Sequence, residues 1–497
     1  MDEDLGKTEA ALVAARRDHL AALRSRGNDP FAQTRCEVDA TTAELTARYG
    51  FLEPGQNAEA EGWSLAGRIL SKRKMGKTVF ADLGDRTGRV QLYVRKDEVG
   101  DDAFADWDAI ERGDLIGVRG YMFRSKMGEL TLHVTAFTLV AKALMPLPDK
   151  WHGLADVEKR YRQRYVDLIV NTDVRDAMIL RSRIVAELRR FIDSFGFYEV
   201  ETPTLLHVAG GAAARPFITH SNALDQEMQL RIATELNLKR LIVGGMERVY
   251  EIGRIFRNEG VDTTHNPEFT MLELYCAYWD VGDMLDFNEA LLAHLVEFVT
   301  GGDTSLNHGD DAISFARPFA RIGYLEGLAK YSDGKYTRER LLDPAGAAEI
   351  LRELGLPESP THGHALDKIF ERILEPHLVA PTFVTDYPVV ISPLAKRKRD
   401  DPQLVDRYEL FCANMEISNA FTELNDPDDQ RVRFEASIAD RAKGDEEVPE
   451  PDWDYVRALE YGMPPTAGIG IGVDRLVMLL ADKRSIRDIL LFPMLKK

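Results

Sequence analysis

The chain has 497 residues, of which 44% are hydrophobic and 29% charged, a composition typical of a large globular protein with more than one domain. No stretch approaches twenty consecutive apolar residues, and the first apolar cluster is short and flanked by charges, so we expect a cytoplasmic protein with no signal peptide and no membrane span. Three scattered cysteines argue against a disulfide framework or a zinc site, and a net charge of −19 argues against nucleic-acid binding by the surface as a whole.

Residues 1–60 are predicted to form a helical N-terminal extension. Leucine and alanine recur at helical spacing over residues 1–26, and arginines, Arg16 among them, fall on the other face. A solvated face is the ordinary interpretation of these arginines. Contact with RNA is the alternative.

Residues 61–145 are predicted to form a small β-barrel of the oligonucleotide-binding type. Five short strand-like runs are separated by turns, with a helical interruption near residues 101–112. Phe80 and Gln91 fall on adjacent strands, where a ring can stack on a base and an amide can read a base edge, although each is also an ordinary strand residue. The run from Arg68 to Lys77 holds five basic and no acidic residues, which predicts a local basic patch.

A proline-containing segment at residues 146–160 is predicted to be a linker. The remainder, residues 161–497, is predicted to be a second large domain with a mainly helical insertion at about residues 317–378. Within it, apolar residues at helical spacing predict a helix over residues 174–195, which closes at Gly196.

The most informative stretch is a predicted strand, loop and strand over residues 249–275. The first strand ends at Arg257, and the loop carries His265. The second strand places on one face the residues Phe269, Met271, Glu273 and Tyr275. A buried carboxylate on an aromatic face must meet a protein cation, stay protonated or await a cationic ligand, so an internal salt bridge remains an open alternative.

A second strand repeats this design, because Asn419, Phe421 and Glu423 share one face. Together the two strands predict a pocket with two carboxylates and aromatic walls. An ammonium on an aliphatic stem fits such a pocket, with its charge between Glu273 and Glu423. This description matches the lysine side chain.

Two further features lie near the second strand. Glu409 and Glu416 offer hard oxygen ligands that suit Mg²⁺, which in turn implies phosphate substrates, although two surface glutamates are the simpler interpretation. The segment GIGIGVDRL, from Gly468, predicts a glycine-rich turn that enters a helix, without the spacing of a dinucleotide-binding motif.

At these motifs the sequence resembles class II aminoacyl-tRNA synthetases, and specifically those of the lysyl type. FRNEG with HNPEF is similar to the second signature motif of the family, GIGIGVDRL to the third and GFYEVETP to the first. GGAAARPF, RYRQRYVDL and NAFTELND resemble further lysyl-type segments, so the likeness covers nearly the whole chain.

The resemblance implies an α+β fold in which an antiparallel sheet flanked by helices follows an N-terminal barrel that binds the tRNA anticodon. It implies a homodimer, with Pro203 near the dimer contact. The implied activity uses ATP to convert L-lysine to lysyl-adenylate and pyrophosphate, and then transfers lysine to the 3′-terminal adenosine of tRNA(Lys).

The resemblance also implies the roles of individual residues. Arg257 would bind the ATP α-phosphate and the lysine carboxylate, Arg475 the γ-phosphate and His265 the distal phosphates, which makes these three the catalytic residues. Further ATP-binding residues would be Glu259, Asn266 and Phe269. Lysine would be bound by Gly211, Glu235, Arg257, Glu273, Tyr275, Asn419, Phe421 and Glu423. Glu409 and Glu416 would bind Mg²⁺, and Phe80 and Gln91 would contact the anticodon.

Three alternatives stay open at this point. A class II synthetase for aspartate or asparagine would share the barrel and the hairpin, but Glu273 and Glu423 would repel aspartate. A non-catalytic RNA-binding paralogue would keep the barrel and lose the activation chemistry. A synthetase-like enzyme that modifies a protein lysine would lack the N-terminal barrel.

Overall fold

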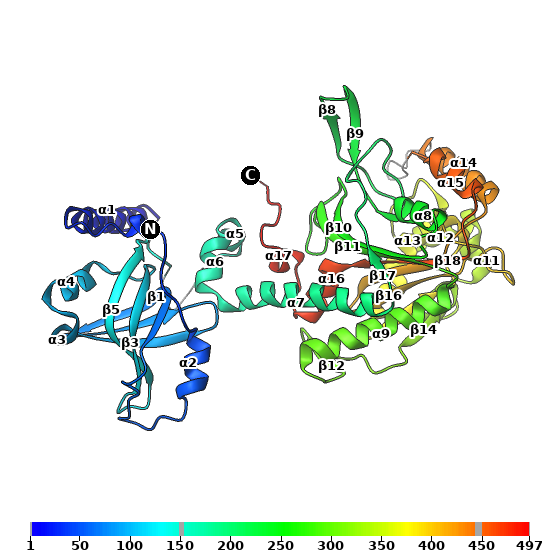
Figure 1. Ribbon diagram of the computed structural model, residues 1–497. Helices are drawn as coiled ribbons and strands as arrows, with labels where there is room; N and C mark the ends of the chain where they lie inside the picture. The colour runs from blue at the N-terminus through cyan, green and yellow to red at the C-terminus, as the bar shows by residue number, and fades with distance from the viewer. Residues whose placement is uncertain (1, 149–153, 443–449, 497) are drawn as a thin grey trace. The chain divides into compact units, whose positions relative to one another are not determined.

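A computed structural model describes residues 2–148, 154–442 and 450–496 of the chain. It divides into two compact units, Met1–Ala155 and Asp156–Lys497, each of which is described by itself (Figure 1). Part of the predicted linker, residues 149–153, lies outside the described residues. Among the described helices, none is both long and apolar enough to cross a membrane.

The first unit contains a closed five-stranded barrel with the strand order β1-β2-β3-β5-β4. Its strands are β1 (Trp63–Met75), β2 (Thr78–Gly84), β3 (Arg89–Arg95), β4 (Leu115–Arg124) and β5 (Leu130–Ala141). Alternate residues point inward, as Val79, Ala81 and Leu83 of β2 do, and they fill the barrel with apolar side chains. The predicted barrel is therefore confirmed.

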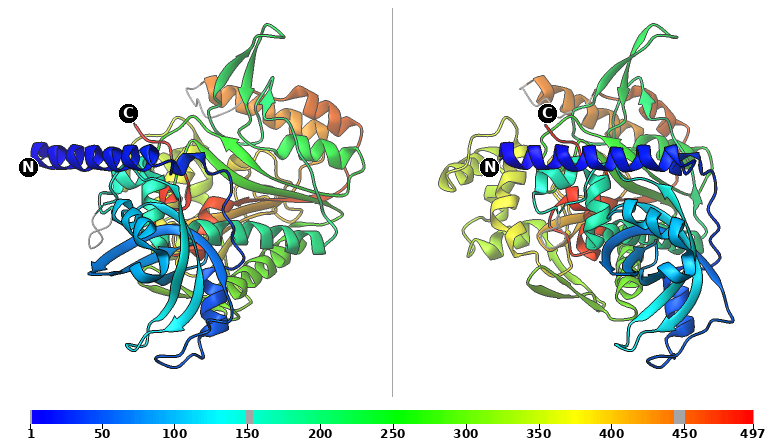
Figure 2. Two further views of the ribbon diagram at one scale, coloured as in Figure 1. Left: turned by 60° about the vertical axis from the view of Figure 1, so that its left-hand side comes forward. Right: turned by 90° about the vertical axis from the view of Figure 1, so that its left-hand side faces the viewer.

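One long helix and several short ones lie around the barrel. They are α1 (Asp2–Ser25), η1 (Pro30–Ala32), α2 (Thr42–Tyr49), α3 (Lys96–Val99) and α4 (Asp101–Ala109). Figure 2 shows α1 lying across one end of the barrel. Arg16, expected on an exposed face, is instead buried and donates to the backbone oxygen of Ala143 at 2.7 Å, so it ties α1 to the barrel.

The prediction of a basic patch on β1 is wrong for two of its residues. Arg68 donates to the backbone oxygen of Gly113 at 2.6 Å, and Lys72 donates to that of Ile110 at 2.6 Å. These cations satisfy carbonyl groups of the fold and are not available to a polyanion.

The second unit is built on an eight-stranded sheet with the order β14-β15-β16-β17-β18-β11-β10-β6. In that order the strands are Ala320–Gly323, Thr382–Thr385, Arg407–Cys412, Met415–Thr422, Thr466–Gly472, Glu268–Ala277, Arg248–Phe256 and Tyr198–Glu199. The six central strands pair antiparallel, and only the outer pairs β14–β15 and β10–β6 are parallel. An antiparallel sheet was predicted and is confirmed.

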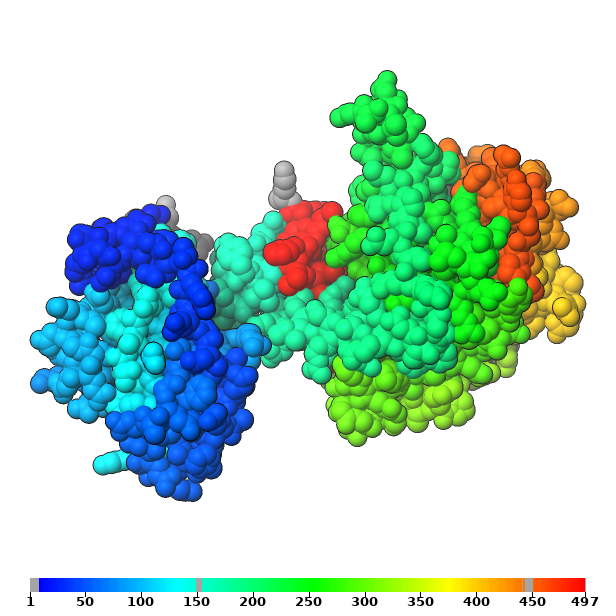
Figure 3. All heavy atoms as spheres, viewed as in Figure 1, coloured from blue at the N-terminus to red at the C-terminus, as the bar shows by residue number. Residues whose placement is uncertain are grey.

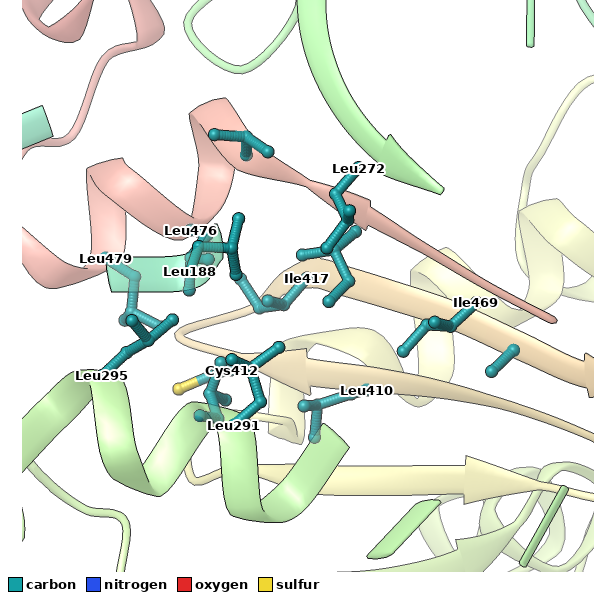
Figure 4. Close-up of a cluster of buried hydrophobic side chains, with 14 of the residues drawn as sticks. Leu188, Leu272, Leu291, Leu295, Leu410, Cys412, Ile417, Ile469, Leu476 and Leu479 are labelled. Carbon is teal, nitrogen blue, oxygen red and sulfur yellow. The ribbon is translucent and has the colours of Figure 1, made fainter. Parts of the chain in front are cut away.

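Three helices cover one face of this sheet and form the main core. They are α7 (Thr172–Ser194), α9 (Val281–Thr300) and α16 (Val473–Leu480). Figure 4 shows Leu291 and Leu295 of α9 packed near Leu410 and Cys412 of β16. The helix predicted over residues 174–195 corresponds to α7, and Gly196 follows it with φ +79°.

The other elements lie around this layer. Before the hairpin they are α5 (Val157–Arg162), α6 (Arg164–Val170), β7 (Leu205–Leu206), β8 (Ile218–Ser221), β9 (Gln226–Leu230) and α8 (Glu235–Val243). Strands β8 and β9 form an arm that projects from the second unit (Figure 3).

After the hairpin, β12 (Ser305–His308) and β13 (Asp311–Ser314) form a small separate hairpin. A helical group between β14 and β15 contains α10 (Tyr324–Tyr331), α11 (Arg338–Leu342), α12 (Pro344–Glu353), α13 (His362–Ile373) and η2 (Glu375–His377). The last elements are η3 (Val389–Ile391), α14 (Pro427–Ala442), α15 (Trp453–Glu460) and α17 (Ile486–Ile489).

The glycine-rich segment is not a turn, contrary to the prediction. Residues 466–472 form the strand β18, which pairs with both β11 and β17, and α16 begins directly after it. A Cβ on Gly468 would overlap with the Tyr275 ring and with Oε1 of Glu423. The glycine is therefore required by side chains that approach the strand closely.

Candidate active site

A cavity of about 710 Å³ lies on the second unit, over strands β11, β17 and β18. All but one of the site residues predicted in this unit line it: Gly211, Glu235, Arg257, Glu259, His265, Asn266, Phe269, Glu273, Tyr275, Glu409, Glu416, Asn419, Phe421 and Arg475. The exception is Glu423. Segments far apart in the sequence thus meet at one cavity, because adjacent strands of the sheet carry them.

Strand β11 has the predicted alternation. The residues that face the cavity include Phe269, Met271, Glu273 and Tyr275. The residues between them that enter the main core are Leu272, Leu274 and Cys276. The cavity and the core therefore lie on opposite faces of the same strand.

Glu273 is a buried carboxylate without a protein cation beside it. Its side chain accepts a hydrogen bond from the Thr234 backbone N–H at 3.0 Å and one from the Tyr275 hydroxyl at 3.2 Å. It forms no ion pair with any residue that the structure describes. Burial, together with the nearby charge of Glu235, raises the pKa of Glu273 to about 7.

Glu423 differs from this, and the expectation that it is an unpaired carboxylate facing the cavity is wrong. It is fully buried and pairs through Oε2 with Nζ of Lys239, a residue of α8. The same ammonium also pairs with Glu235, one helical turn earlier. For Glu423 the alternative of an internal salt bridge is therefore the correct one.

Lys239 sits in the environment that was predicted for a ligand ammonium. Its Nζ lies 5.3 Å from the centroid of the Phe421 ring and 6.0 Å from that of Tyr275, and Tyr455 closes a third side at 5.7 Å. Burial alone would lower the pKa of the Lys239 ammonium, but the charges of Glu235 and Glu423 raise it above its ordinary value. Lys239 is therefore a permanent cation of this site.

Arg257 supplies positive charge to the cavity. It directly follows β10, its guanidinium carbon lies 5.2 Å from the centroid of the Phe269 ring, and its Nε donates weakly to the backbone oxygen of Ile232 at 3.4 Å. Within the described part of the chain it has no carboxylate at ion-pair distance. Burial lowers its pKa, which indicates a desolvated cation that an anionic ligand would stabilise.

A second cationic group joins the hairpin loop to α16. Arg475 donates from Nη2 to His265 Nε2 at 3.0 Å, and its Nη1 lies 3.3 Å from Glu416. The other ring nitrogen of His265, Nδ1, lies 2.8 Å from Asp262. An arginine can only donate, so Nε2 accepts from Arg475 and Nδ1 is the ring nitrogen that can donate to Asp262.

The two predicted metal ligands lie in the same cavity, and each already has an arginine partner. Glu409 pairs with Arg407 at 2.5 Å and accepts from the Tyr387 hydroxyl at 2.7 Å, while Glu416 lies near Arg475. Burial, opposed by the charge of Arg407, raises the pKa of Glu409 to about 7. The described residues contain no group of three or more metal-binding side chains.

The remaining predicted residues have simple structural settings. Asn419 accepts a hydrogen bond from Arg407 at 3.1 Å. Asn266 is buried and donates to the backbone oxygen of Glu268 at 2.6 Å, and Gly211 has φ +93°. Glu259 lies in the loop after Arg257 and lines the cavity.

Sequence reasoning missed Lys239, although a signal was present. Glu235 and Lys239 stand four residues apart on a helix, the spacing at which opposite charges meet. The contact with Glu423 could not be read from spacing, because it joins α8 to a residue after β17.

In the first unit, Phe80 and Gln91 lie on the paired strands β2 and β3, as predicted. Phe80 packs against Tyr93 with ring centroids 5.0 Å apart, and Tyr93 lies 5.7 Å from Phe123, so aromatic rings continue across three strands. Oε1 of Gln91 accepts from the Thr131 hydroxyl at 3.1 Å. This contact uses only the amide oxygen of Gln91, and its amide nitrogen is a separate hydrogen-bond donor.

Comparisons with known proteins agree with both units. The family model described as an OB-fold nucleic acid binding domain matches residues 63–140, and that of class II tRNA synthetases (D, K and N) matches residues 156–496. A protein of Halalkalibacterium halodurans named lysine–tRNA ligase is 48% identical over the full chain and 98% of its own length. Another of that name, from Moorella thermoacetica, is 49% identical over 99% of both chains. The chain belongs to the class II tRNA synthetase family of the D, K and N group.

Proposed function

We propose that the protein is a lysine–tRNA ligase, which activates L-lysine with ATP and transfers it to the 3′-terminal adenosine of tRNA(Lys). One observation supports the choice of amino acid: the buried carboxylate of Glu273 has no cation at ion-pair distance among the described residues and faces a cavity with aromatic walls. Such a group lowers its free energy by binding an ammonium. The relatives that carry the name lysine–tRNA ligase over nearly full length support the same choice.

The proposed lysine-binding site follows the distribution of charged side chains in the cavity. Arg257 binds the carboxylate, and Glu235 with Gly211 binds the α-ammonium. Glu273 and Tyr275 receive the side-chain ammonium, and Glu423 contributes Oε1, which lies with the Tyr275 ring beside Gly468. Phe421 and Asn419 flank the aliphatic stem, since both line the cavity beside β18.

ATP is proposed to occupy the end of the cavity that carries the hairpin loop. Phe269 stacks on adenine, and the Arg257 guanidinium beside its ring reaches the α-phosphate. Glu259 and Asn266 seat the adenosine. Arg475 and His265 exchange their mutual hydrogen bond for contacts to the terminal phosphates.

Glu409 and Glu416 fit a Mg²⁺ site, because Mg²⁺ usually takes one or two carboxylates and completes its shell with water and substrate phosphates. Their arginine partners balance the two charges when no metal is bound. Bound Mg²⁺ supplies charge neutralisation at the phosphates.

The chemistry needs no protein nucleophile. The lysine carboxylate attacks the α-phosphorus of ATP, the bond to the bridging oxygen breaks, and pyrophosphate leaves with that electron pair. Arg257 orients both reactants and stabilises the charge that develops on the α-phosphate. The 3′-hydroxyl of tRNA then attacks the carbonyl of the adenylate, and AMP leaves.

In the first unit, Phe80 and Gln91 are proposed to contact the anticodon, with the rings of Phe80 and Tyr93 as a stacking surface. This assignment explains how a chain of net charge −19 binds RNA, because stacking and edge recognition do not require a uniformly basic surface.

The proposed assembly is a cytoplasmic homodimer. Apolar side chains are exposed in α7 and in the GFYEVETP segment that follows it, among them Ile179 of α7 and Tyr198 of β6. Exposed apolar area of this kind is typical of a surface that pairs with a second chain. Sedimentation equilibrium tests the dimer, and a mass of one chain at micromolar concentration would contradict it.

ATP–pyrophosphate exchange with each of the twenty amino acids tests the proposed activity. We expect exchange with lysine only. Exchange with aspartate or asparagine and none with lysine would replace the proposal by the first alternative, because the D, K and N enzymes share the family. Charging of tRNA, compared with labelling of protein acceptors, separates the ligase from the remaining alternatives.

A further inference from the structure

We propose that Lys239 is a positioning residue that sets the specificity of the cavity for a substrate with two ammonium groups. This inference rests on the proposed function. Its basis is a cluster of buried charges that is incompletely balanced within the protein: Lys239 bridges Glu235 and Glu423, while Glu273 stays without a cation.

The charges of the cluster can be counted. Three carboxylates are buried, with exposed fractions of 7% for Glu235, 3% for Glu273 and 0% for Glu423. One ammonium, Lys239, is buried with them at 0% exposure. With all three carboxylates ionised, two negative charges remain, and they equal the α-ammonium and ε-ammonium of bound lysine, while Arg257 balances the lysine carboxylate. An amino acid with an apolar side chain would leave one buried carboxylate uncompensated.

The geometry leaves acceptor atoms for the substrate. Lys239 contacts Oε2 of Glu423, whereas Oε1 is buried and has no hydrogen-bond partner among the described residues. Oε1 lies where a Cβ of Gly468 would stand, and Gly468 lines the cavity. Glu235 likewise lines the cavity and uses Oε1 for Lys239. The ammonium thus contacts one oxygen of each carboxylate, and Oε1 of Glu423 lies beside Gly468, a residue that does line the cavity.

Lys239 also determines whether these carboxylates are ionised or protonated when the substrate binds. Its ammonium pairs with two glutamates and is surrounded by Tyr275, Phe421 and Tyr455. Moving it into water would leave both carboxylates buried without a partner, which is costly. Without it, Glu423 would be a buried carboxylate near the charges of Glu235 and Glu273, and it would take up a proton. The total of two negative charges would then be kept, but Glu273 would be the only charged one of the two glutamates proposed to hold the ε-ammonium.

The test compares Lys239→Met with Lys142→Met in the full-length protein. Lys142 is an equally buried lysine, paired with Glu111 at 2.6 Å and Asp114 at 2.8 Å in the first unit, so it controls for the loss of a buried ion pair. For each variant, ATP–pyrophosphate exchange gives KM for lysine and for ATP. Inhibition by norleucine, which lacks the ε-ammonium, gives a KI.

For Lys239→Met we expect KM for lysine to rise at least about 30-fold, equivalent to about 2 kcal/mol. KM for ATP should stay within about threefold, and KI for norleucine should rise much less than KM for lysine, because norleucine shares only the α-ammonium that Glu235 is proposed to bind. Below pH 7, KM for lysine should fall more steeply with rising pH in Lys239→Met than in the unsubstituted chain, because Glu423 must then lose a proton in addition to Glu273. Lys142→Met should leave KM for lysine unchanged.

Equal losses for lysine and norleucine in Lys239→Met, or an unchanged pH slope, would overturn the inference. If Lys239→Met does not fold, Lys239→Gln is measured in the same way, since its amide keeps a hydrogen-bond donor without the charge. Wild-type affinity for lysine in that variant would equally overturn it. Exchange without lysine dependence in the unsubstituted chain would instead overturn the proposed function itself.

Discussion

Replacing Glu273 by glutamine removes the charge proposed to select the substrate and changes little else. Glutamine keeps an oxygen to accept the Thr234 backbone N–H, and the Tyr275 hydroxyl can turn to accept from its amide. No resident cation is left unpaired, because none within the described residues pairs with Glu273. The variant therefore isolates the interaction with the ligand.

The expected effect on lysine is large. Loss of one partner of a desolvated charge pair costs about 2 to 5 kcal/mol, which raises KM for lysine by roughly 30-fold to a few thousand-fold. KM for ATP should change by less than about twofold, since Arg475 and His265 are joined to each other and not to Glu273. ATP–pyrophosphate exchange at varied lysine and varied ATP measures both constants.

The same variant should be more stable than the wild type at alkaline pH when lysine is absent. Burial raises the pKa of Glu273 from 4.5 to about 7, so ionisation costs folding free energy as pH rises from 4.5, and the full cost is present above 7. A shift of this size corresponds to about 3 kcal/mol. Glutamine does not ionise, so the Tm difference between variant and wild type should grow between pH 5 and 8.

A matched control is Glu289→Gln. Glu289 is a buried glutamate on α9 that pairs with Arg317 at 2.9 Å, outside the cavity. It should lower stability and leave KM for lysine unchanged. Equal increases of both KM values in Glu273→Gln, or a rise in KM for lysine no greater than in the control, would refute the assignment of Glu273.

Three other substitutions test separate parts of the account. Arg475→Ala should raise KM for ATP at least about tenfold with little change for lysine, because a charge-assisted contact to phosphate contributes about 1.5 to 3 kcal/mol; exchange kinetics measure both. Phe80→Ala should weaken tRNA charging while exchange is unchanged, because base stacking contributes about 1 to 3 kcal/mol per base. Gly468→Ala should reduce both lysine affinity and Tm, because the methyl group would overlap with buried side chains. ATP–pyrophosphate exchange measures the first effect and thermal unfolding the second.

Each of these has a result that would contradict it. For Arg475→Ala it is a larger change in KM for lysine than for ATP. Normal charging kinetics in Phe80→Ala would remove the ring from the anticodon site. Wild-type stability in Gly468→Ala would mean that Glu423 and Tyr275 move aside at no cost.

The parts of the site that follow from local periodicity could be predicted from the sequence. The alternation of β11 sends Glu273 to the cavity and Leu272 to the core, and it depends only on the two-residue repeat of a strand. The turn residues of the hairpin loop likewise predict where His265 lies. Five strand-like runs, separated by turns and one helical interruption, likewise predict a barrel.

The parts that depend on contacts between distant segments could not be predicted. Alternation placed Glu423 correctly on the face of Phe421, but it could not show that α8 delivers Lys239 to the same point. Glycine at alternate positions of β18 suggested a turn, since the neighbours that exclude a side chain are on other strands. The lysine in the middle of the basic run, Lys72, is drawn into the barrel wall by carbonyl groups beyond the run.

Calorimetry of lysine binding tests the central claim most directly, namely that a buried carboxylate without a protein cation receives the ammonium of the substrate. Titrations at pH 6.5 in buffers of different ionisation enthalpy give the number of protons exchanged. With a pKa of about 7, Glu273 is mostly protonated at this pH and must lose its proton to pair with lysine. We predict net proton release in the wild type and none in Glu273→Gln. No release from the wild type, or equal release from both proteins, would contradict the account.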